Sequence, residues 1–152
     1  MPPPIGILLT HCLPGLITGN SPADMATDLG LPEFAPEQAV KFAREGGRVF
    51  TIPAEKGNAV FITNRNFSGV CSVAVRKANA TRYRGALDKW LGPQSPFRLV
   101  RETRDEGEKQ TRRDYRADIG AIPIVVFVTI ADAARSDGMQ ILMTAARVQK
   151  EN

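Results

Sequence analysis

The spacing of apolar residues changes near residue 48, and this change limits the fold more than any other feature of the sequence. Before it, apolar side chains recur at helical spacing, first in the series Ile5, Leu8, Leu9, Cys12, Leu13, Leu16 and Ile17. After it, most of the chain alternates at a period of two, which is typical of half-buried strands. Helices followed by strands on short turns predict an α+β domain with an antiparallel sheet of about six to seven strands.

Three short helices are expected ahead of the sheet. The first covers residues 5–19 and should kink at Pro14, because proline cannot donate a backbone hydrogen bond. The second begins at Ser21, with Pro22 in its first position, and ends near Gly30. The third begins at Pro36 and is closed by glycines 46 and 47.

The strands are expected in two groups, separated by one amphipathic helix. The first group covers residues 49–52, 59–63 and 70–75, with a turn over 64–69, and the second covers 98–104, 109–118, 122–130 and 140–148. The run 122–130 is apolar on both faces, which indicates a central strand.

The helix over residues 78–91 places Tyr83, Ala86, Leu87, Trp90 and Leu91 on one face. We expect this face, with Trp90 in the core, to pack on the side of the sheet that carries Cys71, and the helices to gather on that side.

Length and composition indicate one domain. The chain has 152 residues, of which 43% are hydrophobic and 24% are charged, so residues 1–152 are expected to form a single domain with 1–4 flexible and 149–152 frayed. No apolar run approaches the ~20 residues that cross a bilayer. The net charge of +4, from 20 basic and 16 acidic residues, is small for a protein that binds nucleic acid by counterion release.

The N-terminus and the cysteines bear on localisation. Three prolines follow Met1 without a basic segment, so the start is not an intact signal peptide. A mature end left after signal removal predicts a periplasmic or secreted protein, and an ordinary cytosolic start is the alternative. Cys12 lies on the apolar helix face and Cys71 on the inward face of a strand. The two sulfurs either meet in a disulfide or are separate buried thiols.

The chain resembles a family of small exported bacterial proteins of unknown function. The matching features are the helix-borne Cys12, the segment Gly30-Leu31-Pro32 before a helix, a Gly-Gly turn into the sheet, and the strand Gly69-Val70-Cys71-Ser72-Val73. The match covers roughly residues 8–148 of this chain. The resemblance implies a periplasmic location and a Cys12–Cys71 bridge, and it implies no activity.

We find no set of residues that predicts catalysis, a cofactor or a metal site. His11 is the only histidine, and its neighbour Cys12 points about 100° away on a helix. A zinc site needs three or four clustered ligands. The glycines form neither a phosphate loop nor a dinucleotide fingerprint. The protein is therefore expected not to be an enzyme.

The densest charge lies in residues 98–118. Along the second strand of this hairpin Arg113 and Tyr115 share one face, while Arg112, Asp114 and Arg116 share the other. The face is either a solvent surface that discourages edge pairing or a platform for a partner. The candidate partner-binding residues are Arg101, Arg112, Arg113, Asp114, Tyr115 and Arg116.

Three functions are consistent with the sequence. The first is a non-enzymatic exported protein that binds a macromolecular partner through its sheet or charged hairpin. The second is a small-ligand binder with a pocket between helix 78–91 and the sheet. The third is a weak nucleic-acid binder in which Tyr115 stacks on a base beside Arg113. The sequence does not indicate an oligomeric state.

Overall fold

A computed structural model describes residues 1–43, 47–64, 67–136 and 138–148. Residues 65 and 66 of the expected turn at 64–69 lie outside the described residues. Gly46, expected to close the third helix, and the last four residues of the chain lie outside them as well. The helical elements are α1 (Pro3–Ile7), η1 (Leu8–Cys12), α2 (Leu13–Thr18), α3 (Pro22–Asp28), α4 (Pro36–Ala39), η2 (Pro53–Glu55) and α5 (Ala80–Trp90).

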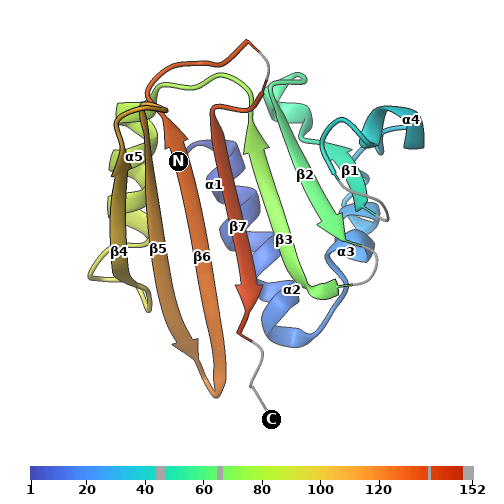
Figure 1. Cartoon of the computed structure of the whole chain (residues 1–152). Coiled ribbons are helices and arrows are strands. Elements are labelled where there is room, and N and C mark those ends of the chain that lie inside the picture. The colour runs from blue at the N-terminus through green and yellow to red at the C-terminus, as the bar shows by residue number, and fades with distance from the viewer. Residues whose placement is uncertain (44–46, 65–66, 137, 149–152) are drawn as a thin grey trace.

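Seven strands form one antiparallel sheet in the order β1-β2-β3-β7-β6-β5-β4 (Figure 1). The strands are β1 (Gly47–Thr51), β2 (Ala59–Asn64), β3 (Phe67–Val75), β4 (Arg98–Asp105), β5 (Gln110–Ile119), β6 (Ile122–Ala131) and β7 (Ile141–Arg147). The predicted α+β class is confirmed. Strand β6 lies between β5 and β7, so its prediction as a central strand is also confirmed.

The first helix runs from Pro3 to Thr18 with a π-helical turn at its centre. Pro14 has no N–H to donate to Thr10, and the chain accommodates this in η1, where the N–H of Leu13 bonds the carbonyl of Leu8. The widened turn just before a proline is a known route around the lost hydrogen bond. Residues 3 and 4 were expected to be flexible; they belong to α1, and Pro4 is buried.

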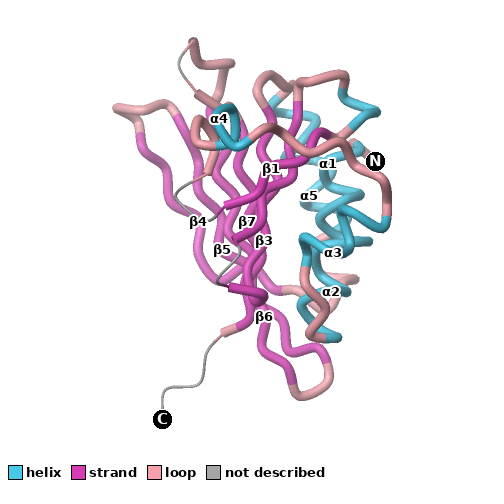
Figure 2. Tube along the Cα trace, turned by 90° about the vertical axis from the view of Figure 1, so that its right-hand side faces the viewer, coloured by secondary structure: helices cyan, strands magenta, loops and turns pink. Residues whose placement is uncertain are grey.

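The main core lies between the sheet and the helices α1, α2, α3 and α5, which cover one face (Figure 2). Helix α4 is an exception to the expected gathering of helices. It packs with Val49, Val60 and Ala74, which point away from the main core. These residues alternate with Phe50, Phe61 and Val73, which point into it, so β1, β2 and β3 are apolar on both faces and need a cover on each.

Helix α5 starts with Asn79 as N-cap, whose side chain accepts from the N–H of Arg82, and it buries Tyr83 and Leu87. The expectation that Trp90 lies in the core is wrong, because the Trp90 side chain is 39% exposed. The helix ends at Trp90, and the change of backbone direction at Leu91, with φ −115°, turns Leu91 into the core in its place.

A disulfide joins Cys12 of η1 to Cys71 of β3, with the Cα atoms 6.1 Å apart. Both residues are buried in the main core. Of the two alternatives left by the sequence, the bonded pair is the one observed. The bridge fixes the N-terminal helix to an interior strand of the sheet.

None of the described helices has the length and apolar character needed to cross a membrane.

Candidate functional site

The charged hairpin formed by β4 and β5 presents two different faces. Thr111, Arg113, Tyr115 and Ala117 point toward the helices and are buried. Arg112 and Arg116 are exposed on the opposite face, which we call the open face, and Asp114 is partly exposed there. The predicted direction of the Arg112, Asp114 and Arg116 side chains is confirmed. The candidate residues Arg113 and Tyr115 do not belong to this surface.

On the open face, Arg112 is already engaged. Its Nε lies 2.8 Å from Oδ1 of Asp114, and its guanidinium lies 4.9 Å from the centre of the Phe127 ring. A shallow hollow of about 360 Å³ occupies this part of the hairpin, lined by Arg101, Thr103, Asp105, Gln110, Arg112 and Asp114. The hollow brings Arg101, Arg112 and Asp114 of the predicted site together.

Three arginines of the hairpin have no acidic partner among the residues that the structure describes. Arg98, Arg101 and Arg116 are exposed, and their side chains form no hydrogen bond or ion pair with any residue that the structure describes. Arg98 and Arg116 are direct Cα partners across the β4–β5 ladder. Like charges at opposite positions repel each other, so this end of the hairpin has a net positive charge that an anionic group would relieve.

The buried side of the hairpin holds an ion cluster around Arg113, which is 9% exposed. Its Nη1 lies 2.7 Å from Oδ1 of Asp88 and 3.2 Å from the Tyr115 hydroxyl, and its Nε lies 3.0 Å from Oε1 of Glu102. Burial alone would lower the pKa of Arg113, but the hydrogen bonds to Tyr115, Glu102 and Asp88 raise it. Burial raises the pKa of Tyr115 as well. The cluster ties α5 to both strands of the hairpin.

Tyr115 is 3% exposed, which corrects one of the functional hypotheses. A base can stack only on an accessible ring. The tyrosine proposed for nucleobase stacking is instead buried in the main core, and its hydroxyl accepts a hydrogen bond from Nη1 of Arg113.

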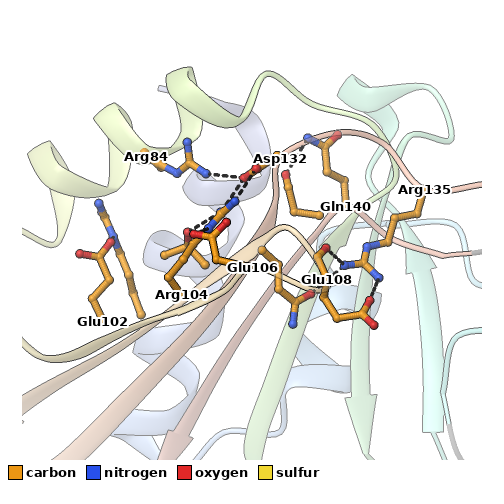
Figure 3. A network of polar contacts seen from close by, with 12 residues as sticks. Arg84, Glu102, Arg104, Glu106, Glu108, Asp132, Arg135 and Gln140 are labelled. Atoms are coloured by element: carbon orange, nitrogen blue, oxygen red, sulfur yellow. Dashed lines mark hydrogen bonds and ion pairs between the residues drawn. The ribbon is translucent and has the colours of Figure 1, made fainter.

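A second ion cluster holds the turn end of the hairpin (Figure 3). Both terminal nitrogens of Arg104 bind Asp132, at 2.8 and 2.7 Å, and Arg84 of α5 binds the same carboxylate at 3.1 Å. Hydrogen bonds from Arg104 lower the pKa of Asp132 to about 2. Arg135 adds contacts to Glu108 and Gln110. The hairpin is thus held in place by ion pairs along its length.

The two edges of the sheet differ. At β1, the segment 32–34 covers the edge: Glu33 forms a bridge with Phe50, the Phe34 N–H bonds the Val49 carbonyl at 2.8 Å, and the Thr51 N–H bonds the Pro32 carbonyl at 2.8 Å. At the other edge, all eight residues of β4 are exposed. Within the described part of the chain, only β5 pairs with β4.

A cleft of about 550 Å³ lies where the end of α5 meets the start of β4. Most of its lining is apolar, from Leu91, Pro93, Phe97, Leu99 and Tyr115, with the charged residues Asp88 and Arg98 beside them. The cleft lies in the region where the sequence suggested a ligand pocket, between helix 78–91 and the sheet. Its volume is within the usual range of sites for small molecules and anchoring side chains.

Sequence reasoning missed Asp88, Glu102 and Arg98. Asp88 lies on the polar side of the helix pattern, and only the folded arrangement brings it within reach of Arg113. Arg98 was counted among the hairpin charges but not among the candidate residues. The sequence carried no signal for it, since strand alternation puts Glu102 on the same face as Arg98, and only the bulge between Leu99 and Arg101 moves Glu102 to the face of Arg113.

The other side chains considered for chemistry are placed apart. His11 is partly buried, and the sulfur of its neighbour Cys12 is bonded to Cys71. No group of three or more potential metal ligands comes together among the residues with described positions.

Comparisons with known proteins found no matching family model, no matching curated protein and no matching solved structure.

Proposed function

We propose that this chain is a non-enzymatic exported protein that binds a partner protein by accepting an extended acidic segment as an additional strand beside β4. One observation carries the proposal: the sheet has one edge covered by its own chain and one edge, β4, that is exposed along eight residues. An exposed edge strand offers a row of backbone donors and acceptors to an incoming strand.

The charges of the hairpin support an acidic partner. Among the described residues, Arg98, Arg101 and Arg116 are exposed without acidic partners. Two nearby acids are engaged, Asp114 by Arg112 and Glu102 by Arg113, and the exposed Asp118 beside Arg116 leaves the three arginines in excess. Carboxylates on the open-face side of an added strand would therefore meet unpaired guanidinium groups. Complementary charge of this kind speeds association and selects the partner.

The two ion clusters support a rigid docking edge. Charged residues often protect an edge strand from pairing, but here Arg104 and Glu102 are directed to Asp132 and Arg113. These contacts hold β4 against α5 and β5, so an incoming strand would not have to order the edge. Preorganisation of this kind reduces the entropic cost of binding.

Export is supported by the bonded cysteines. A disulfide between two buried residues persists in oxidising compartments and is uncommon in the cytosol. The bond therefore favours a periplasmic or secreted location over the cytoplasmic alternative.

The proposal is tested with a blocked heptapeptide of alternating aspartate and valine, which has no free termini. We expect its titration to shift the backbone amide signals of residues 98–105 and to protect the outward-facing amides of β4 from hydrogen exchange. Two matched triple variants separate local charge from net charge. Reversal of Arg98, Arg101 and Arg116 to glutamate should abolish binding at low salt.

The control reverses Arg76, Arg82 and Arg147, which are also exposed, and changes the net charge equally. It should bind the peptide with at most a modest loss. If both triple variants weaken binding to the same degree, the attraction is a property of net charge and the edge-strand proposal is wrong. Shifts centred on β6 and β7 instead of β4 would assign the contact to the open face of the sheet.

A further inference from the structure

The register of β5 on β4 shows what an added strand would meet. Strand β4 bulges at Val100, so Arg101, Leu99 and Arg98 face three consecutive residues of β5, namely Asp114, Tyr115 and Arg116. Arg98 and Arg101 point to the open face, as their partners do, and Leu99 points toward the helices with Tyr115. An added strand on the free side of β4 that pairs across the bulge in the same way as β5 would meet the same alternation of side chains between the two faces.

The cleft lies on the helix side of this alternation. Leu99 and Tyr115, the paired residues at its floor, both line it, and Leu91, Pro93 and Phe97 complete its apolar wall. Leu99 is 48% exposed, whereas the large apolar side chains of the core are buried. A side chain opposite Leu99 on an added strand would point toward this wall.

Charged residues border the apolar wall of the cleft. The carboxylate of Asp88 is bound by Arg113, which also binds Glu102. Arg98, the other charged residue of the lining, has no ion pair among the described residues. The rest of the lining is mostly apolar and favours an uncharged side chain beside Leu99, while Arg98 and Arg101 favour acids at the positions on either side of it.

We infer that the partner segment carries a core of acid, large apolar residue and acid, in which the acids meet Arg101 and Arg98 and the apolar side chain fills the cleft beside Leu99. This inference rests on the proposed function. Backbone pairing would supply affinity along β4, and the cleft would supply selectivity for one side chain, as in other cases of strand addition.

Three blocked heptapeptides with identical threonine and valine flanks test the inference. Their central triplets are aspartate–phenylalanine–aspartate, aspartate–alanine–aspartate and lysine–phenylalanine–lysine. We expect the first to bind at least about tenfold more tightly than the second, because burial of an aromatic side chain separates them. The third should bind much more weakly than the first. Amide shifts should appear in β4 with both aspartate peptides and in residues 91–97 with the phenylalanine peptide.

Two neighbouring aliphatic residues give a matched pair of variants. Leu99 lines the cleft, whereas Val100, which is 60% exposed, does not. Leu99→Ala should reduce the preference for phenylalanine over alanine at least about threefold, and Val100→Ala should preserve it. Thermal unfolding checks that both variants are folded. We expect that they are, because the Leu99 and Val100 side chains are exposed.

The outcomes separate the two proposals. Equal binding of the phenylalanine and alanine peptides, with shifts in β4, would overturn the side-chain inference and leave strand addition intact. Shifts confined to residues 91–97, equally strong with the lysine peptide, would overturn both and make the cleft a site for small apolar ligands. No shift with any peptide at about millimolar concentration, where weak complexes form, would also overturn both.

Discussion

Loss of the Cys12–Cys71 bond should lower the free energy of unfolding by about 4 kcal/mol. The two cysteines are 59 positions apart, and the chain-entropy relation for a closed loop of this length gives about 14 cal/mol/K, or about 4 kcal/mol at 25 °C. The bond closes a loop that contains α2, α3, α4, β1 and β2. The unfolded chain therefore gains much of its freedom when the bond is broken.

The measurement compares oxidised protein with protein that has been reduced in denaturant and refolded with reductant present. Urea unfolding followed by circular dichroism gives the free energy of each form. The two forms have the same side chains, so their difference reports the bond and not the packing. The melting temperature should fall by roughly 8–16 °C for a chain of this size. The slope of free energy against urea should rise, because the reduced unfolded state exposes more surface.

The double variant with both cysteines changed to alanine provides the control. It should lose at least as much stability as the reduced protein, since it also loses buried sulfur contacts, and reductant should have no effect on it. A difference of less than about 1 kcal/mol between the oxidised and reduced forms would refute the loop-closure reasoning. It would mean that the N-terminal helix docks equally well without the covalent bond.

Three further predictions concern single side chains. Arg113→Ala should lower the free energy of unfolding by roughly 1–3 kcal/mol, because it leaves the two carboxylates and the tyrosine hydroxyl without their shared donor. Arg112→Ala on the open face should lower it by about 0–1 kcal/mol. Equal losses in urea unfolding would argue against the two-face assignment. The Asp132 carboxyl should titrate near pH 2 by NMR. Because its folded pKa is depressed, its contribution to stability is present above its ordinary pKa near 4 and is lost as the pH falls through 2; a midpoint near 4 would mean that its arginine contacts do not form in solution. Trp90→Ala should cost less than about 1.5 kcal/mol and Leu87→Ala about 2–5 kcal/mol, and Trp90 fluorescence should be readily quenched by acrylamide; a protected Trp90 would place it back in the core.

The strands were predictable because their signal is local. In β6 an apolar run on both faces identified an interior strand, and in β5 the alternation of Arg112 with Arg113 assigned opposite faces correctly. Which of the two arginines is buried follows from α5, which supplies Asp88 from a distant part of the sequence. No periodicity within β5 contains that information.

Other features depended on how elements meet. The spacing of α5 puts Trp90 in line with Tyr83, but the helix ends there and Leu91 takes the buried position. The position of α4 could have been anticipated from Val49 and Val60, since alternating positions on both faces of the first strands are apolar. The exposed edge at β4 could not be predicted, because strand order was not determined by the turns alone.

The difference between the two sheet edges also limits how copies of this chain can assemble. A fibre that grows by strand pairing needs two open edges on each subunit, so that every added copy presents a new one. Here the segment 32–34 covers the β1 edge. Two copies that met at β4 would bury both open edges, and growth would stop at a closed pair. A folded chain can thus expose an acceptor strand without seeding its own polymerisation.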